Sequence, residues 1–194
     1  MFEQGLLLDT ESFILAHLSG SSEDKKLVSG FSVGKNALGL EEYLKGYSFE
    51  GERCGENRTY LVKDRVTGEL VCYFSLRAGL IPVPSGGDGY LSTFPAIELS
   101  YFAVNASYRR TKTTPRRIGL YVFNTFILPV VRFAAQIIGA RFLYVYALPI
   151  PRLILHYAQE MGFRQLPDGL AGFLYERVKP DSDKGCVFML QPLY

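Results

Sequence analysis

Five basic side chains lie close together in the middle of the chain with no acidic residue among them. They are Arg109, Arg110, Lys112, Arg116 and Arg117. A long apolar stretch that begins at Ile118 follows, and it is expected to be helical. The first N–H groups of a helix form an anion site, and basic side chains add charge-assisted hydrogen bonds to phosphates. The spacing predicts a pyrophosphate site, and the alternative is a basic turn that only faces solvent.

One carboxylate stands where it could take up a proton. Glu98 lies in the strand-like segment Ala96–Val104. Alternation along a strand puts Glu98, Ser100, Phe102 and Val104 on one face and Leu99, Tyr101 and Ala103 on the other. A carboxylate can accept a proton from an attacking amine, commonly through water. The alternative is an exposed strand carboxylate or a structural ion pair.

Metal and thiol chemistry have little support. The chain has 3 cysteines and 2 histidines. Cys54, Cys72 and Cys186 lie far apart without a CxxC pair, and His17 and His156 are too few for a multi-histidine centre. We expect no metal, no disulfide framework and inert thiols.

The first half of the chain combines predicted helix and hairpin. The polar stretch 19–26 reads as a surface loop, and 38–47 as a helix. Segments 59–63 and 69–76 flank the turn-rich DRVTG and predict an antiparallel hairpin. Residues 82–95 contain proline and glycine and are expected to form a loop.

The second half alternates strands and helices. We expect a strand over 96–104, a helix over 118–138 kinked at Pro129, a strand over 141–147, a helix over 151–161 capped by Gly162, and closing strands over 170–178 and 185–191. This order requires the strands at 96–104 and 141–147 to pair in parallel. The sequence therefore predicts an α/β (α+β) fold with a mixed, mostly antiparallel sheet, a parallel central strand pair and flanking helices.

Composition limits the classes of protein. The 194 residues are 48% hydrophobic, which excludes a mostly disordered chain and fits a single domain over 1–194. A net charge of +2 excludes a histone-like cationic protein. Residues 118–138 have the length of a membrane span, but Arg132 and Pro129 lie inside, so a buried core helix is the preferred interpretation. The N-terminal residues lack the basic flank and the long apolar run of a signal peptide, so we expect a cytoplasmic protein without membrane contact.

The succession of hairpin, long strand, basic turn, helix, strand and helix over about 59–191 resembles the Gcn5-related N-acetyltransferase (GNAT) family. In that family the central strand ends in an apolar-Val pair, a Tyr-Arg follows, and an (Arg/Gln)-x-x-Gly-x-(Gly/Ala) loop opens the helix. Ala103-Val104 and Tyr108-Arg109 match the first two elements, and an inserted TKTTPRR precedes the loop. The nearest match to the loop is Arg116, Arg117, Ile118, Gly119, Leu120 and Tyr121, with Tyr121 replacing the second small residue.

The resemblance implies acetyl-CoA as acyl donor and direct attack by a primary amine in a ternary complex. The loop would hold the pyrophosphate, and the pantetheine arm would pair with the backbone of Phe102, Ala103 and Val104. Glu98 occupies the position of the family's general base. A family tyrosine that protonates the leaving thiolate stands four residues before a Gly-Phe, here Gly162-Phe163, but that position holds Ala158. Tyr157, one residue earlier, is the candidate acid, with His156 as the alternative.

Three N-terminal segments are similar to acetyltransferase toxins that act on aminoacyl-tRNA. These toxins carry Phe-x-Cys-Gly, Leu-Asp-x-Trp-Leu and Gly-x-x-Arg-Thr-Tyr. Here the matching segments are FSVG at 31–34, LEEYL at 40–44 and GENRTY at 55–60, with Val33 in place of the cysteine and Tyr43 in place of the tryptophan.

Three functions follow as expectations. The first is an acetyl-CoA-dependent N-acetyltransferase acting on a small-molecule or peptide amine. The second is an acyl-CoA-binding module whose site has decayed, and the third is a toxin-like enzyme with tRNA as partner. Loops at 80–95 and 179–186 are expected to bind the acceptor, with Asp181 and Asp183 as candidate contacts to a cationic amine. We expect a monomer or a homodimer.

Overall fold

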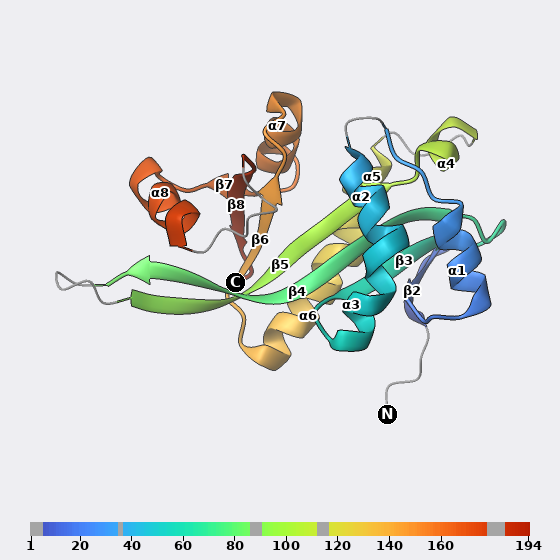
Figure 1. Cartoon of the computed structure of the whole chain (residues 1–194), viewed down its shortest axis with the longest axis horizontal. Helices are drawn as coiled ribbons and strands as arrows, with labels where there is room; N and C mark the ends of the chain where they lie inside the picture. The colour runs from blue at the N-terminus through green and yellow to red at the C-terminus, as the bar shows by residue number, and fades with distance from the viewer. Residues whose placement is uncertain (1–5, 35–36, 86–90, 112–116, 178–184) are drawn as a thin grey trace. The chain divides into compact units, whose positions relative to one another are not determined.

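The computed structural model describes residues 6–34, 37–85, 91–111, 117–177 and 185–194, and its elements are shown in Figure 1. In chain order they are β1 (Leu6–Asp9), β2 (Phe13–His17), α1 (Ser22–Ser29), α2 (Leu38–Glu42), η2 (Tyr43–Tyr47), α3 (Ser48–Cys54), β3 (Arg58–Asp64), β4 (Leu70–Pro84), β5 (Leu91–Val104), α4 (Ala106–Thr111), α5 (Ile118–Val122), η3 (Phe123–Ile127), α6 (Leu128–Ile138), β6 (Phe142–Ala147), α7 (Pro151–Gln159), β7 (Arg164–Gln165), α8 (Asp168–Arg177) and β8 (Val187–Pro192). The two η elements are π-helical turns.

The strands hydrogen-bond in the order β1-β2-β3-β4-β5-β6-β8-β7. β3 and β4 form the predicted antiparallel hairpin, which aligns Leu61 with Tyr73. β5 and β6 pair in parallel, with Ala96 opposite Phe142 and Glu98 opposite Tyr144. β6 then pairs antiparallel with β8. The mixed sheet with one parallel pair confirms the predicted fold class.

The chain divides into two compact units. Unit 1 comprises Met1–Arg77 and Ser100–Ile127, and unit 2 comprises Ala78–Leu99 and Leu128–Tyr194. The strands β4 and β5 and the long helix that starts at Ile118 contribute residues to both units. A single domain over the whole chain stays a prediction.

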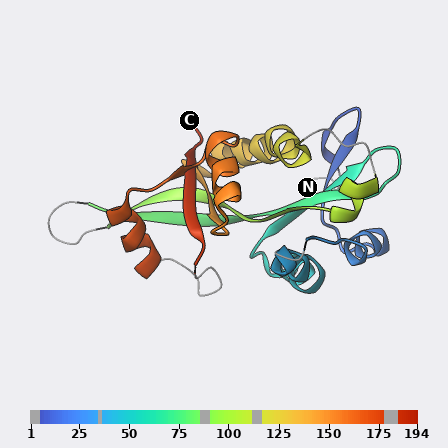
Figure 2. The same cartoon turned by 90° about the horizontal axis from the view of Figure 1, so that it is seen from above.

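In unit 1, helices cover both faces of the sheet: α1, α2 and α3 lie on one face and α5 on the other (Figure 2). The core below α1 and α2 is apolar and includes Leu18, Val28, Phe31, Leu44, Leu61 and Tyr73. Tyr43 of η2 stacks on Tyr101 of β5, with 3.5 Å between ring centroids and 7° between ring planes. Burial of side chains of this size stabilises the fold by roughly 1.5–3 kcal/mol each.

The expectation of a loop over 19–26 is wrong, because α1 begins at Ser22. Ser21 caps the helix by accepting a hydrogen bond from the Asp24 backbone N–H at 3.1 Å. The buried Asp24 carboxylate binds Lys63 of β3 at 2.9 Å and the Ser19 backbone N–H at 2.8 Å. The composition of this segment is typical of a loop, but hydrogen bonds to residues elsewhere in the fold stabilise it as a helix.

The expectation of a strand over 170–178 is also wrong. α8 runs over Asp168–Arg177, and the Leu170 N–H donates to the Pro167 carbonyl at 3.0 Å. Leu174 is buried in a cluster of unit 2 with Ile81, Tyr144 and Phe188. Phe173 and Leu174, which suggested a strand, instead pack from this helix into the apolar cluster.

The loop expected at 82–95 is shorter than predicted, because β4 reaches Pro84 and β5 begins at Leu91. Residues 86–90 lie outside the described part of the chain.

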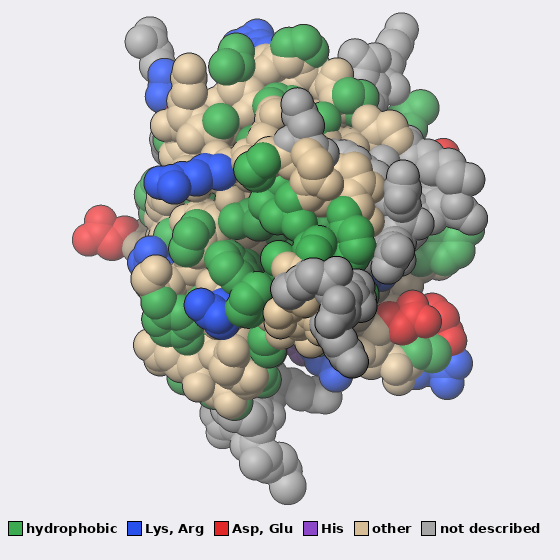
Figure 3. Space-filling view, turned by 90° about the vertical axis from the view of Figure 1, so that its left-hand side faces the viewer, with side chains coloured by type: hydrophobic (Ala, Val, Ile, Leu, Met, Phe, Trp, Pro, Cys, Tyr) green, Lys and Arg blue, Asp and Glu red, His purple; other side chains and the backbone are tan. Residues whose placement is uncertain are grey.

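Several apolar side chains of unit 2 are exposed, among them Leu80, Leu91, Leu148, Ile150 and Leu155. Figure 3 shows hydrophobic side chains gathered at the middle of one side of the molecule.

The predicted helix over 118–138 is confirmed as one continuous helix made of α5, η3 and α6. Its π-helical turn ends two residues before Pro129. By length and composition alone this helix could cross a membrane, a test that core helices also pass. Buried residues along it include Val122, Phe126 and Val131.

Candidate functional site

The start of the long helix has the geometry of an anion site. Arg117, the residue before α5, has φ 74° and ψ 45°, and among the described residues it alone is a non-glycine with positive φ. This left-handed conformation costs a non-glycine residue about 1–2 kcal/mol. The Tyr121 N–H donates to the Arg117 carbonyl at 3.1 Å, so the N–H groups of Ile118, Gly119 and Leu120 precede the first helical bond. These donors are the groups that an anion would contact.

Gly119 brings the helix start against the end of β5. A Cβ at Gly119 would lie 3.8 Å from Val104 Cγ2 and 3.9 Å from Phe102 Cζ. Phe102 and Val104 therefore face α5, while Tyr101 and Ala103 face the opposite core, as strand alternation predicted. The Tyr121 ring packs on Phe13 of β2 at 5.7 Å between centroids.

The short helix α4, which the sequence did not predict, fixes the start of the basic segment. Asn105 Nδ2 donates to the Leu70 carbonyl at 2.8 Å. The Tyr108 hydroxyl donates to Asp64 Oδ2 at 2.6 Å, and burial together with this carboxylate raises the pKa of Tyr108. Arg109 follows on the surface. Lys112, Arg116 and the Arg110 side chain, all predicted to bind phosphate, lie outside the described residues, so their role stays a prediction.

Glu98 is buried, with 4% of its surface exposed. The Tyr144 hydroxyl of β6 donates to Glu98 Oε2 at 2.8 Å. The parallel register explains this contact because it places the two residues side by side. The alternative of an exposed strand carboxylate is therefore wrong, and the role of Glu98 as a base stays a prediction.

Gly79 of β4 makes room for the Tyr144 ring. A Cβ at this position would lie 2.3 Å from the Tyr144 hydroxyl oxygen and 2.8 Å from its Cε1. Tyr144 is itself buried and stacks on Phe188 of β8 at 5.3 Å between centroids. Only glycine at position 79 leaves the tyrosine where it reaches Glu98.

Gly79→Ala is expected to destabilise the protein by about 1–3 kcal/mol, because the methyl group would overlap the buried Tyr144 ring. Urea denaturation measures the change. Gly172→Ala in α8 is the matched control, since a Cβ there meets nothing within 4 Å. An unchanged unfolding midpoint for Gly79→Ala would contradict the close contact.

Tyr157 lies in the core of unit 2 on α7, which begins at Pro151 as predicted and ends at Gln159. Tyr157 is 7% exposed, and its ring meets Phe163 edge-on at 5.4 Å and 83°. Burial raises the pKa of Tyr157 to about 12. Its neighbour His156 forms an ion pair with Glu160 at 3.2 Å. Gly162 has a φ of 77°, which suits the predicted glycine after the helix.

Tyr157→Phe tests the proposed acid because it removes only the hydroxyl. If the phenol protonates the leaving thiolate, turnover should fall by roughly tenfold or more with little change in stability. A pKa raised to about 12 keeps this hydroxyl protonated, so it adds no pH dependence to the rate below about pH 10. Full activity in Tyr157→Phe combined with loss of activity in His156→Ala would assign the proton to His156.

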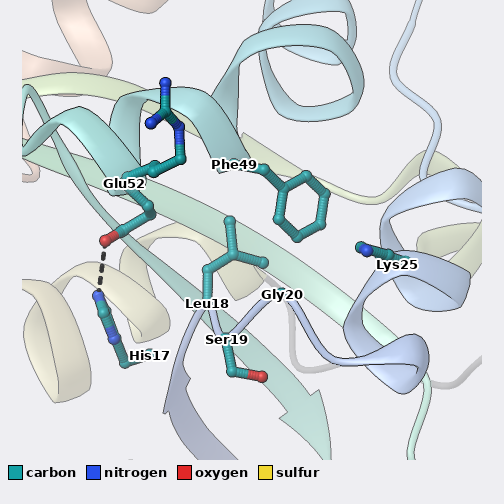
Figure 4. A pocket seen from close by; sticks show the side chains of 8 residues that line it. His17, Leu18, Ser19, Gly20, Lys25, Phe49 and Glu52 are labelled. Atoms are coloured by element: carbon teal, nitrogen blue, oxygen red, sulfur yellow. Dashed lines mark hydrogen bonds and ion pairs between the residues drawn. The ribbon is translucent and has the colours of Figure 1, made fainter.

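Two pockets in unit 1 were not predicted. The first, of about 400 Å³, lies between the end of β2 and α3 (Figure 4). Its Glu52 carboxylate is already bound by His17 at 3.0 Å, by Arg58 at 3.3 Å and by the Thr59 backbone N–H. These contacts give Glu52 a structural role in joining α3 to β2 and β3.

The second pocket, of about 310 Å³, is lined by residues of α2, η2, α3 and the neighbouring strands. Glu42 and Tyr43 come from the segment at 40–44, and Glu56 and Asn57 from the segment at 55–60. Both segments carry the similarity to the tRNA-acting toxins, which is the signal that could have revealed this pocket.

The predicted acceptor residues Asp181 and Asp183 lie outside the described residues. No metal-binding cluster of three or more His, Cys, Asp or Glu occurs in the described ranges.

Comparison with known proteins supports the fold. No family model matches the sequence, and no curated protein matches it. A variant of KacT with tyrosine replaced by phenylalanine is 18% identical, with a TM-score of 0.65, covering 94% of this chain and 96% of that chain. AtaTR bound with acetyl-CoA is 17% identical, with a TM-score of 0.60 and 95% of each chain covered. AtaT complexed with acetyl-methionyl-tRNAfMet is 17% identical, with a TM-score of 0.61, covering 93% of this chain and 94% of that chain. The chain has the fold of these solved structures, a mixed α/β fold that agrees with the resemblance to the GNAT family.

Proposed function

We propose that this protein is an N-acetyltransferase that moves the acetyl group of acetyl-CoA to a primary amine. The observation that carries the proposal is the helix start at Arg117–Leu120, set against the end of β5 by Gly119. It lies in a fold whose solved examples include a complex with acetyl-CoA.

The N–H groups of Ile118, Gly119 and Leu120 and the guanidinium of Arg117 would hold the pyrophosphate, joined by the remaining basic residues of the turn. The backbone of Phe102–Val104 would pair with the pantetheine arm. The bound donor supplies a thioester carbonyl that an amine can attack. The amine nitrogen forms the new C–N bond as the C–S bond breaks, with Glu98 taking a proton from the amine and Tyr157 giving one to sulfur.

An aminoacyl-tRNA is the second candidate acceptor, because its α-amine is a primary amine. The segments at 31–34, 40–44 and 55–60 support it, and so does the AtaT structure with acetyl-methionyl-tRNAfMet. The sequence has a net charge of only +2, so tRNA contact would depend on local basic residues.

Release of free coenzyme A in the presence of acetyl-CoA tests the proposal. The acceptors should include small amines, peptide N-termini and charged tRNA, with uncharged tRNA as control. Activity with charged tRNA alone would select the second candidate. Binding of acetyl-CoA by calorimetry without thiol release for any acceptor would instead favour a decayed acyl-CoA-binding module.

A further inference from the structure

The basic segment 109–117 begins directly after a strong hydrogen bond. The Tyr108 hydroxyl donates to Asp64 Oδ2 at 2.6 Å, a length typical of a hydroxyl that donates to an ionised carboxylate. Burial acts to raise the pKa of Asp64, but hydrogen bonds from Tyr108 and from the β3–β4 turn outweigh burial and lower this pKa below its usual value. Asp64 is therefore charged at neutral pH, and it holds Tyr108, the neighbour of Arg109, in place.

The segment ends at a second contact, which involves two aromatic rings. Tyr121 of α5 packs its ring on Phe13 of β2, with 5.7 Å between centroids and 58° between ring planes. The Tyr121 backbone N–H donates to the Arg117 carbonyl at 3.1 Å, in the first hydrogen bond of the helix. Tyr121 stands where the GNAT loop has glycine or alanine, so this contact needs a side chain that the family's loop lacks. The ring contact ties the helix start to β2.

The two residues that hold these ends, Asp64 and Phe13, are direct partners in the sheet. β2 and β3 pair antiparallel, and their register places Phe13 opposite Asp64. Residues directly opposite in such a pair have Cβ atoms about 4.5–5.5 Å apart on one face of the sheet. Phe13 is buried, and Asp64 also accepts hydrogen bonds from the N–H groups of Val66 and Thr67 at 2.9 and 2.8 Å. Contacts of their own therefore fix both partners.

We infer that this cross-strand pair positions both ends of the basic segment for the pyrophosphate of acetyl-CoA. Asp64 acts through Tyr108 at the start of the segment, and Phe13 acts through Tyr121 at its end. Holding the two ends lowers the conformational entropy that phosphate binding must remove. The inference rests on the proposed acetyl-CoA site, and it gives β2, which lies outside the region of GNAT resemblance, a part in donor binding.

Tyr108→Phe and Phe13→Leu test the two ends separately. The first change removes only the hydroxyl that binds Asp64. The second removes the ring that packs on Tyr121 but keeps an apolar side chain in the core. Calorimetry should show acetyl-CoA affinity weakened at least about fivefold in each variant, which is the lower end of ordinary coupling between two sites. The KM for acetyl-CoA should rise with little change in kcat.

Tyr73→Phe is the matched control, because it also removes a tyrosine hydroxyl that donates a hydrogen bond in unit 1. The Tyr73 hydroxyl donates to the Leu40 carbonyl, in the core below α1 and α2. This variant should lose stability in urea denaturation while its acetyl-CoA affinity stays unchanged. The control therefore separates a loss of stability from a loss of position at the basic segment.

Unchanged acetyl-CoA affinity in Tyr108→Phe or in Phe13→Leu would overturn the shared role of the pair, and so would an equal loss of affinity in Tyr73→Phe. Failure of the proposed function gives a different result. If acetyl-CoA binds but no acceptor releases coenzyme A, the enzyme function is refuted, and the affinities of the variants still decide the role of the pair. A wild-type protein that does not bind acetyl-CoA would refute both.

Discussion

Glu98→Gln should lower turnover on the true acceptor by roughly 100-fold or more while leaving acetyl-CoA affinity nearly unchanged. The amide keeps the size of the side chain and can still accept a hydrogen bond from the Tyr144 hydroxyl. What it loses is the ability to take the proton that the attacking amine must release. The measurement is steady-state kinetics together with calorimetric titration of acetyl-CoA.

Tyr144→Phe tests how far turnover depends on the hydrogen bond that positions Glu98, because the Glu98 carboxylate itself is unchanged in this variant. This change removes the donor at 2.8 Å from Glu98 Oε2 but keeps the ring that packs on Phe188. We expect a loss of turnover smaller than that of Glu98→Gln, because the carboxylate remains able to accept a proton. Full activity in Glu98→Gln would make Glu98 a structural partner of Tyr144 and would remove it from the mechanism.

Replacing Arg116 and Arg117 together with Ala should weaken acetyl-CoA binding by roughly 100-fold or more. Charge-assisted hydrogen bonds contribute about 1.5–3 kcal/mol each, which corresponds to about tenfold or more for each arginine. Alanine at position 117 would also have to adopt the left-handed φ of 74° that now precedes α5. Calorimetry with acetyl-CoA at two salt concentrations measures the loss and its electrostatic part.

Arg53→Ala provides the control for a general effect of charge. Arg53 is exposed and paired with Glu50 on α3, away from the helix start at Arg117. Acetyl-CoA affinity should therefore stay unchanged in this variant. If the double arginine variant also retains full affinity, the pyrophosphate does not bind at this turn.

Local patterns in the sequence were sufficient to predict the helices and strands around the central strand pair. Pro151 at the start of α7 and Gly162 after its end gave clear boundaries, and the connection through a helix required β5 and β6 to be parallel. The segment 19–26 was misjudged because its order depends on Asp24 meeting Lys63, a contact distant in sequence. The strands β1 and β2 were missed, since they gain their backbone partners only from one another and from β3.

The candidate site was only partly predictable for the same reason. Strand alternation placed Phe102 and Glu98 on one side of β5, and the structure confirms that Phe102 faces the helix start. The contact of Tyr144 with Glu98 could not be read from the sequence. It depends on the parallel register and on the missing side chain at Gly79, which belongs to a third strand.

The π-helical turn at Phe123–Ile127 indicates where one residue could be deleted from the long helix. A π turn holds one more residue than an α turn over the same backbone path. Deleting one residue there, such as Thr125, should convert the turn to an ordinary α turn and keep the side chains of α6 on their present faces. The same deletion within Leu128–Ile138 would rotate every later helical residue by about 100° and expose buried Ala135. The long helix therefore has one place where loss of a residue should be tolerated.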